Sequence, residues 1–460
     1  MSAYPVIRLM LPDRTLEFSG EEVIDAVLVE EIDPISAELP ISTIEFKIVQ
    51  YDESFSMFAG EIYQQLSERL PVVVYERIDG VNVLMGRFFL DDWENVSENE
   101  FLFKAVNIIG VMEKTDFDGL FWSESTRLET MLAQVLNPIG VSYVLHDDLK
   151  DLERSGWIAP GNYRKALQQI CFAAGASATT ARRQSLLIKP LSLSEEAILT
   201  RVFTEISDGD KLMDQLVKLL PFVTSIELIA HSYTEGTQQE VVFEQYLEAG
   251  SHKIVFQKPL YNLTVEGPGY AAEVMGTEDG HYVGTEDGNY IEAGGEYNFG
   301  PNVLYLNISE GGIVKITGFP RVDSMQSFFY KAPAGVGAAN KLTMKIEDAT
   351  LVGPGSAPDI LDRLADYFDQ RYEKNMKLLP TNVKIDSTIL TTTIHHNYIL
   401  GNVEKMVFNL AGGFLSDVMA IGIHVDAIYS RTPRCGIAVA GSSLTWQNKF
   451  RERTFVVRRF

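Results

Sequence analysis

A chain of 460 residues is too long for one hydrophobic core, so we expect two to four compact units. Its residues are 46% hydrophobic and 22% charged, which excludes an intrinsically disordered chain. The formal net charge of −24 argues against stable nucleic-acid binding, because affinity for a phosphate backbone comes from lysine and arginine. No apolar run reaches the roughly 18 residues of a membrane helix, so we predict no membrane insertion. The N-terminus lacks the pattern of a signal peptide, and we expect folding in a cytoplasm-like compartment.

The first hundred residues carry the alternating pattern of β-strands. Residues 44–48 alternate apolar and charged side chains, which predicts a half-buried strand. Asp79-Gly80 lies between two β-rich runs and predicts a hairpin, because both central residues of a type I′ turn need positive φ. Residues 1–115 are therefore predicted to form a first antiparallel, tube-like β domain.

Helical patterns begin near residue 125. Thr126 followed by Glu129 is typical of a capping box, and it precedes an apolar stripe at Leu128, Met131, Leu132, Val135 and Leu136. A second helix is predicted from Asn162 to Ala174 and ends at Gly175, and residues 175–179 are interpreted as a loop. With short strands at 141–145 and 186–189, residues 116–198 are predicted to form a small α/β domain.

The strand pattern returns near residue 220 and is interrupted by one long helix. Ser356 is expected to cap this helix, and its buried face is predicted to comprise Ile360, Leu361, Leu364, Ala365, Phe368 and Tyr372. Residues 199–430 are predicted to form a second β domain with a hairpin insertion near 266–300. Strands are expected at 223–229, 239–243, 253–256, 263–265, 303–308, 313–317, 342–346, 382–385 and 407–409.

Residues 431–460 are predicted to form a C-terminal β arm that breaks the acidic trend. In its last twelve residues five cations are opposed only by Glu452; they are Lys449, Arg451, Arg453, Arg458 and Arg459. This pattern is typical of a surface strand with charged flanks. The alternative is a docking arm for an acidic neighbouring subunit.

One true repeat occurs, because the octapeptide at 276–283 recurs at 284–291. Each copy places an Asp-Gly turn before a tyrosine and a β-branched residue, which favours a small protruding hairpin. The alternative is binding of a cation or partner by Glu278, Asp279, Glu286 and Asp287. Calcium prefers such oxygens, but the spacing of an EF-hand loop is absent.

We predict no catalytic, cofactor-binding or metal-binding residue. His395 and His396 are adjacent in a β-like run and should point to opposite faces, and His146 beside two aspartates is typical of a solvated turn. Residues 335–340 lack the third glycine of a dinucleotide-binding fingerprint. Two cysteines, Cys171 and Cys435, are too few for a disulfide framework or a four-cysteine zinc site, and Cys171 is expected to be a buried free thiol.

Four stretches together resemble the baseplate-hub and tail-tip family of phages and related contractile injection systems. The first is a hairpin that ends in Gly86-Arg87-Phe88-Phe89-Leu90, and the second is the turn Asp118-Gly119-Leu120-Phe121. The third is the helical run at 163–176, and the fourth is Asn409-Leu410-Ala411-Gly412-Gly413-Phe414.

The resemblance implies a mostly β, α+β chain with two tail-tube-like antiparallel β-barrel domains and an α/β insert between them. It implies a homotrimer in which three chains with two β domains each make a pseudo-sixfold ring. It further implies a tail tube or distal tail protein above, a spike, fibre or other baseplate protein below, and a tape-measure protein in the lumen. The expected location is the tail of a virion, assembled in the host cytoplasm.

Two other functions stay open from the sequence. The first is a peripheral baseplate or receptor-binding component that recognises a host glycan, for which Tyr282 and Tyr290 of the repeat are the one hint. The second is a cell-wall hydrolase, which the missing catalytic motifs disfavour. We therefore predict a structural protein rather than an enzyme.

Overall fold

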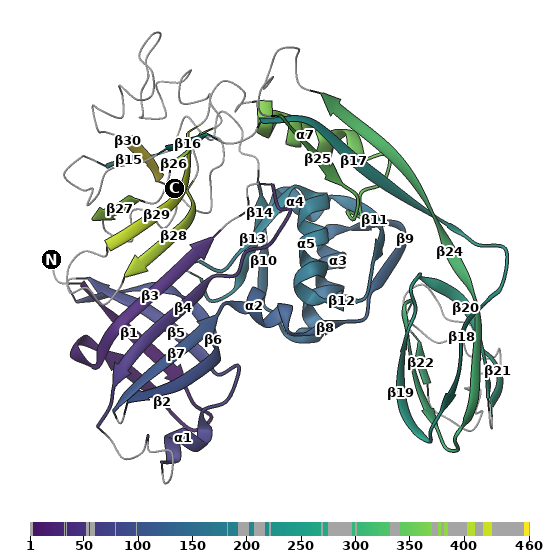
Figure 1. Ribbon diagram of the computed structural model, residues 1–460, viewed down its shortest axis with the longest axis horizontal. Helices are drawn as coiled ribbons and strands as arrows, with labels where there is room; N and C mark the ends of the chain where they lie inside the picture. The colour runs from purple at the N-terminus through teal and green to yellow at the C-terminus, as the bar shows by residue number, and fades with distance from the viewer. Residues whose placement is uncertain are drawn as a thin grey trace.

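The structure is a computed structural model, drawn in Figure 1. It describes residues 3–191 apart from 32, 34, 52–54, 56–59, 79, 98 and 182. It also describes residues 222–369 apart from 268–269, 275–296, 300 and 332–340. The remaining described segments are 202–206, 217–219, 376–378, 381–384, 403–409, 417–425 and 455–459.

The N-terminal region is a strongly curved antiparallel sheet whose apolar positions alternate along the strands. Phe46 and Phe103 are fully buried on neighbouring strands, and their rings stack with centroids 5.1 Å apart. The predicted hairpin is present, and Gly80 has φ +86° at its turn. The strands are β1 (Ala3–Met10), β2 (Thr15–Ser19), β3 (Val23–Glu31), β4 (Thr43–Val49), β5 (Pro71–Ile78), β6 (Val81–Ser97) and β7 (Glu100–Val106), with helices η1 (Gly20–Glu22) and α1 (Glu61–Gln65).

Strands from the far end of the chain extend this same sheet. Strand β28 (Val403–Asn409) pairs antiparallel with β3, with Val407 opposite Val29. The order of the twelve-stranded sheet is β16-β26-β29-β28-β3-β4-β7-β6-β5-β1-β2, and β27 pairs with β29. The sheet therefore joins residues almost four hundred positions apart. The added strands are β16 (Val217–Leu219), β26 (Met376–Leu378), β27 (Thr381–Lys384) and β29 (Asp417–Val425).

The α/β unit begins at α2 (Ile108–Glu113) and packs two helices, α3 (Leu128–Leu136) and α5 (Tyr163–Ala174), on a short sheet. The apolar stripe of α3 and the stop of α5 at Gly175, which adopts φ +65°, are confirmed. The structure adds an N-cap, because Asn162 accepts from the backbone N–H of Lys165. The other elements are β8 (Asp116–Phe117), β9 (Leu120–Arg127), η3 (Asn137–Ile139), β10 (Tyr143–Leu145), α4 (Asp147–Lys150), β11 (Glu153–Ile158), β12 (Gly161–Asn162), β13 (Ala176–Thr179) and β14 (Leu186–Pro190).

Two sequence predictions in this unit are wrong. The capping box is absent, because Arg127 is the N-cap of α3 while Thr126 belongs to strand β9. Residues 176–179 form strand β13 rather than a loop. These four small residues are all buried, and they pair antiparallel with β14, which satisfies backbone groups on that side of the strand.

A long twisted ribbon of β17 (Phe222–Glu235) and β24 (Gly312–Lys331) packs on the α/β unit together with α7 (Ala357–Asp369). Strand β25 (Lys341–Ile346) pairs parallel with β17. The predicted helix is thus confirmed, and Ile360, Leu361, Leu364 and Ala365 are buried as expected. The side chains of Phe368 and Tyr372 lie outside the described residues. The ribbon, α7 and the helices of the α/β unit share one hydrophobic core.

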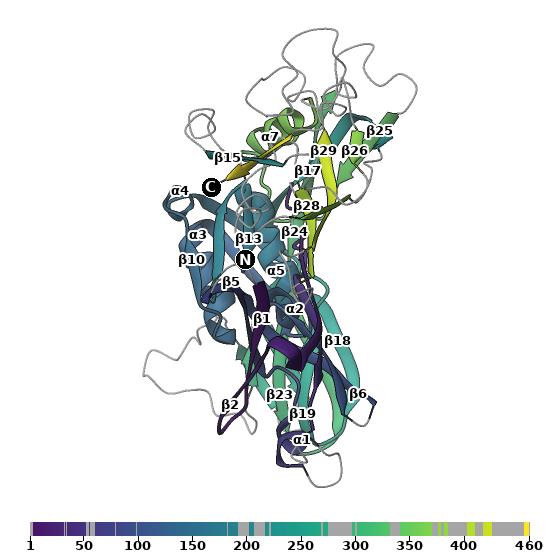
Figure 2. The same ribbon diagram turned by 90° about the vertical axis from the view of Figure 1, so that its left-hand side faces the viewer.

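The N-terminal half of β24 belongs to a separate small β unit, here called the distal unit. Its core contains Ile254, Leu263, Leu306 and Ile316 and is distinct from the larger core. In Figure 1 the first sheet and the distal unit lie at opposite ends of the long axis, with the α/β unit between them, and Figure 2 shows both reaching toward the lower side of the molecule. Its other strands are β18 (Glu240–Leu247), β19 (Gly250–Val255), β20 (Leu260–Gly267), β21 (Tyr270–Val274), β22 (Tyr297–Phe299) and β23 (Val303–Ile308).

Residues 199–430, expected to form one second β domain, are distributed over three parts of the molecule. The ribbon completes the core of the α/β unit, β18–β23 form the distal unit, and β26–β29 extend the first sheet. The mostly β, α+β character is confirmed, while closure into two barrels stays a prediction. The C-terminal arm contributes β30 (Phe455–Arg459), which pairs antiparallel with β15 (Val202–Ile206) of the same chain.

Candidate assembly interface

Three arginines from three adjacent strands lie on one face of the first sheet, close to its free end. Arg8 is on β1, Arg77 on β5 and Arg87 on β6, and each guanidinium lies over an aromatic ring. The rings are those of Tyr75, Tyr4 and Phe89, at 5.1, 5.7 and 5.4 Å from the guanidinium carbon to the ring centroid. We call this set of six residues the arginine face.

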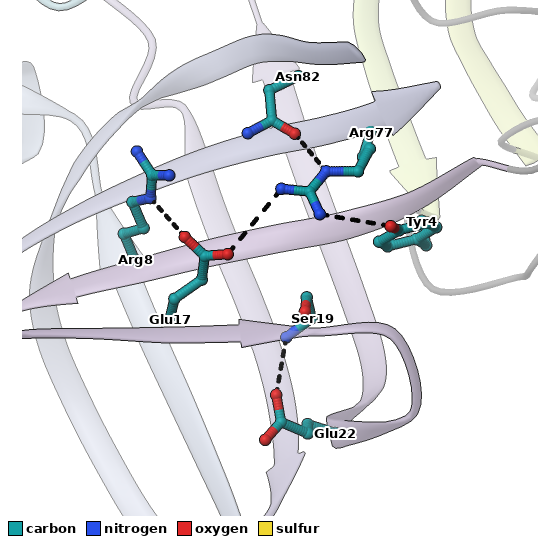
Figure 3. Close-up of polar contacts among 7 residues, drawn as sticks. All are labelled: Tyr4, Arg8, Glu17, Ser19, Glu22, Arg77 and Asn82. Atoms are coloured by element: carbon teal, nitrogen blue, oxygen red, sulfur yellow. Dashed lines mark hydrogen bonds and ion pairs between the residues drawn. The ribbon is translucent and has the colours of Figure 1, made fainter. Parts of the chain in front are cut away.

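Hydrogen bonds between directly opposite residues fix the arginine face in place (Figure 3). Arg8 Nε donates to Glu17 Oε2 at 2.8 Å, and these residues are cross-strand partners on β1 and β2. Arg77 Nε donates to Asn82 Oδ1 at 2.6 Å, and its Nη1 donates to the Tyr4 hydroxyl at 3.4 Å. The second oxygen of Glu17 lies 3.9 Å from Arg77 Nη2. Glu17 therefore bridges two of the three arginines.

The arginine face carries more positive than negative charge. Three guanidiniums are accompanied by one bridging carboxylate, and the hydrogen bond with Glu17 raises the pKa of Arg8 above its ordinary value. Arg87 Nε is buried and has no hydrogen-bond partner among the described residues. The side chains of Arg8, Glu17 and Arg77 are 38%, 40% and 27% exposed, so their outer edges stay accessible to a further molecule.

A second polar cluster lies inside the molecule, where the ribbon meets the α/β unit. His231 Nδ1 lies 2.8 Å from Asp323 Oδ2, and His231 Nε2 lies 2.9 Å from the carbonyl oxygen of Glu347. The His231 backbone N–H donates to the Val352 carbonyl at 2.8 Å. The Tyr233 hydroxyl is buried nearby with no partner among the described residues, and burial together with the charge of Asp323 raises its pKa. This cluster ties the ribbon to residues 347–353, which we call the junction loop.

Contacts on both sides of the α/β unit hold the neighbouring parts. On one side, Asp118 binds the distal unit: its carboxylate accepts from the Tyr305 hydroxyl at 2.6 Å and pairs with Lys253 Nζ at 2.8 Å. The Trp157 indole N–H also donates to Asn302 Oδ1 at 2.9 Å. On the other side, Arg164 Nε donates to the Leu39 carbonyl at 2.8 Å. The turn that begins at Asp118, quoted above for its family resemblance, is thus a contact point between units.

Most of the candidate sites considered from the sequence lie outside the described residues. The repeat at 276–291 with Glu278, Asp279, Glu286 and Asp287, together with His395, His396 and residues 335–340, lies outside the described residues. His146 caps α4 by accepting from the Asp148 N–H, and its side chain is 49% exposed. Within the described part of the chain, no group of three or more histidine, cysteine or carboxylate side chains could hold a metal ion.

Cys171 is a buried free thiol, as predicted, and burial raises its pKa to about 12. A thiol with so little thiolate at neutral pH is a packing residue rather than a nucleophile. Cys435 lies outside the described residues. No described helix has both the length and the apolar composition needed to cross a membrane.

Sequence reasoning missed both the arginine face and the His231 cluster. The arginine face had a local signal: Tyr75 and Arg77, and likewise Arg87 and Phe89, are two residues apart and so share one face of a strand. His231 had no local signal, because Asp323 and Glu347 are 92 and 116 positions away.

No protein-family model matches the chain, and no curated protein matches it. Among solved structures it is similar to the 43 kDa tail protein of prophage MuSo2 from Shewanella oneidensis, with 10% identity and a TM-score of 0.42 over 91% of this chain and 98% of that one. It is also similar to a tail protein from Neisseria meningitidis MC58, with 9% identity and a TM-score of 0.43 over 94% and 98% of the two chains. Prophage tail protein gp18 from Listeria monocytogenes EGD-e gives 11% identity and a TM-score of 0.42 over 90% and 94%. These structural neighbours are all tail proteins, and with such low identities and TM-scores we base the function on this chain's own residues and topology.

Proposed function

We propose that this chain is a structural protein of a phage or phage-like tail, and that three copies form a baseplate or tail-tip hub. The observation that supports this most is the pairing of β3 with β28. One polypeptide thereby supplies an N-terminal and a C-terminal β region that are joined edge to edge. A ring built from subunits with one β region each would need two neighbouring subunits to do the same.

This arrangement suits a closed ring. An unpaired strand edge presents free N–H and C=O groups and invites uncontrolled pairing, and a ring covers every edge with a neighbour. Three chains with two joined β regions each would continue a sixfold tail tube. The tube or a distal tail protein would lie above the hub, and a spike, fibre or other baseplate protein below it.

The proposed role is mechanical rather than enzymatic. The channel would pass DNA and a tape-measure protein, and the net charge of −24 would disfavour stable binding of the passing phosphate chain. The protein would be located in the tail of a virion, after assembly in the host cytoplasm. Peptidoglycan cleavage would then be the task of a partner.

Electron microscopy of the purified chain and of intact tails tests this function. We expect a threefold-symmetric particle around an open channel, and density for the chain on the axis at the tip of the tail. A monodisperse monomer that binds a defined glycan on an array would instead favour the receptor-binding alternative. A monomer that lowers the turbidity of cell-wall fragments would favour a hydrolase.

A further inference from the structure

The arginine face has the composition of a binding surface rather than of an ordinary exposed sheet. Arginine and tyrosine are enriched where protein interfaces bind most strongly. A guanidinium that lies flat on an aromatic ring is held in one orientation, while its N–H edge remains able to bind a carboxylate in two places. Three such pairs occur here on neighbouring strands, at β1, β5 and β6.

The position of the arginine face in the sheet indicates what meets it. At one end of the seven N-terminal strands, β3 is covered by β28 of the same chain. At the other end the sheet finishes with β1 and β2, and β2 has no second strand partner among the described residues. The arginine face lies on this free end, where the next molecule of a ring would have to approach.

The chain also carries a matching acidic surface on the α/β unit, which we call the acidic rim. It comprises the exposed carboxylates Glu129, Asp147, Asp148, Asp151 and Glu153 on α3, α4 and β11 and the turn between them. The side chains of Asp147, Asp148 and Asp151 are 88%, 74% and 87% exposed. Lys150 Nζ lies 2.7 Å from Asp147, and the pKa of Lys150 is raised by this hydrogen bond and by the charges of Glu129 and Asp151.

The acidic rim has a clear excess of negative charge. Five carboxylates are accompanied by the two cations Lys150 and Arg127, which pair with Asp147 at 2.7 Å and with Asp151 at 3.8 Å. The arginine face and the acidic rim are therefore complementary in charge, and they lie on different units of one chain.

We propose that the arginine face binds the acidic rim of a second copy of this chain. Two different surfaces that recognise each other form a head-to-tail contact, and such a contact closes into a ring when the rotation between copies allows it. A cyclic trimer can use only a contact of this kind. The inference rests on the proposed trimeric hub and names the residues that would hold neighbouring copies together.

Sedimentation velocity of the full chain over a range of protein and salt concentrations tests the proposal. Arg8→Gln together with Arg77→Gln removes two charges without adding new ones, and we expect the association constant to fall at least about tenfold. Raising the salt should weaken the wild-type association and have less effect on the double variant. Circular dichroism of the variant checks that the sheet is intact.

Lys315→Gln is the matched control, because Lys315 is also 38% exposed and also faces a carboxylate, Glu266 at 3.9 Å, but lies on the distal unit. This control should associate as the wild type does. A charge exchange tests the acidic rim itself: Arg8→Glu with Arg77→Glu should abolish association, and adding Asp147→Arg with Asp151→Arg in the same chain should restore it.

A trimer whose stability is unaffected by the Arg8/Arg77 substitutions would overturn this inference and leave the proposed hub in place. The inference would also be overturned if Arg8→Glu with Arg77→Glu abolished association and the added Asp147→Arg and Asp151→Arg substitutions did not restore it. The acidic rim would then not be the surface that the arginine face binds. A wild-type chain that remains monomeric at all concentrations would remove the trimeric hub, and this contact with it.

Discussion

The most constrained single side chain in the described part of the molecule is His231. Its side chain is 3% exposed, and its two ring nitrogens face a carboxylate oxygen of Asp323 and a backbone oxygen of Glu347. Substitution by phenylalanine would fill the space but leave the Asp323 carboxylate, which is 24% exposed, without its imidazole partner. Because a partly buried carboxylate that loses a hydrogen-bond partner is destabilised, we expect a loss of about 1–3 kcal/mol in unfolding free energy.

The loss would be measured by chemical denaturation monitored by tryptophan fluorescence. His231→Gln should lose less than the phenylalanine variant, because its amide can still donate to one of the two acceptors. His146→Asn is the control, since this side chain is 49% exposed and asparagine can also accept from the Asp148 N–H as the N-cap of α4, so its effect should stay within about 0.5 kcal/mol. Equal effects at positions 231 and 146 would show that the cluster contributes little to stability.

At the scale of elements, the C-terminus of α5 is the contact point for α7. Gly175 ends α5 with φ +65°, and Arg363 of α7 donates from Nη2 to the Phe172 carbonyl at 3.0 Å. Arg154 donates to the next free carbonyl, that of Ala173, at 2.9 Å. Burial, with the neighbouring charge of Arg154, lowers the pKa of Arg363 to about 10. Two cations thus add hydrogen bonds to the last carbonyl groups of the helix, of which that of Phe172 also accepts from the Gly175 N–H.

Alanine substitutions at two glycines distinguish the contribution of the Arg363 contact from the cost of backbone strain. Gly140 has φ +66° after α3 and open space around it, whereas a side chain at Gly175 would collide with the guanidinium of Arg363. Gly140→Ala should therefore cost only the left-handed backbone, about 1 kcal/mol. Gly175→Ala should cost about 1–3 kcal/mol more, because Arg363 has to leave its site. Thermal unfolding of the two variants compares their stabilities. Equal losses of unfolding free energy would mean that the packing of α7 does not depend on the contact between Arg363 and the end of α5.

Individual elements were predictable from sequence where the pattern is local. Strand β23 begins and ends at the predicted residues, and α5 carries its cap and its stop in its own sequence. The pairing between elements was not predictable in the same way. Nothing near Val407 indicates that its partner is Val29, and the ribbon and α7 complete the core of the α/β unit only through contacts distant in sequence. The arginine face was missed in part for a similar reason, since two of its three pairs, Arg8 with Tyr75 and Arg77 with Tyr4, form across strands.

At the scale of the whole molecule, the distal unit is attached by the ribbon and by polar contacts at Asp118 and Trp157. Half-exposed ion pairs contribute little, about 0–1 kcal/mol each, so this attachment should open easily. Asp118→Ala should broaden the distance distribution between spin labels placed at Tyr246 and Val144, which are 60% and 47% exposed. Adding Trp157→Phe should broaden it further.

The unfolding midpoint should change little in these variants, because the cores of the two units stay intact. Asp92→Ala is the control, since among the described residues its carboxylate contacts only the first sheet, through Lys104 Nζ at 3.9 Å and the Trp93 N–H. A distance distribution that stays narrow in the Asp118 variant would mean that the ribbon alone fixes the distal unit.

The edge-to-edge pairing of β3 with β28 also has a consequence for biosynthesis. Translation delivers β3 to the growing polypeptide several hundred codons before β28 leaves the ribosome. During that interval β3 is an edge without its final neighbour, and a truncated product never acquires it. Only a chain translated at least through β29, which ends at Val425, can complete the sheet, so products that terminate earlier would keep β3 as an unpaired edge.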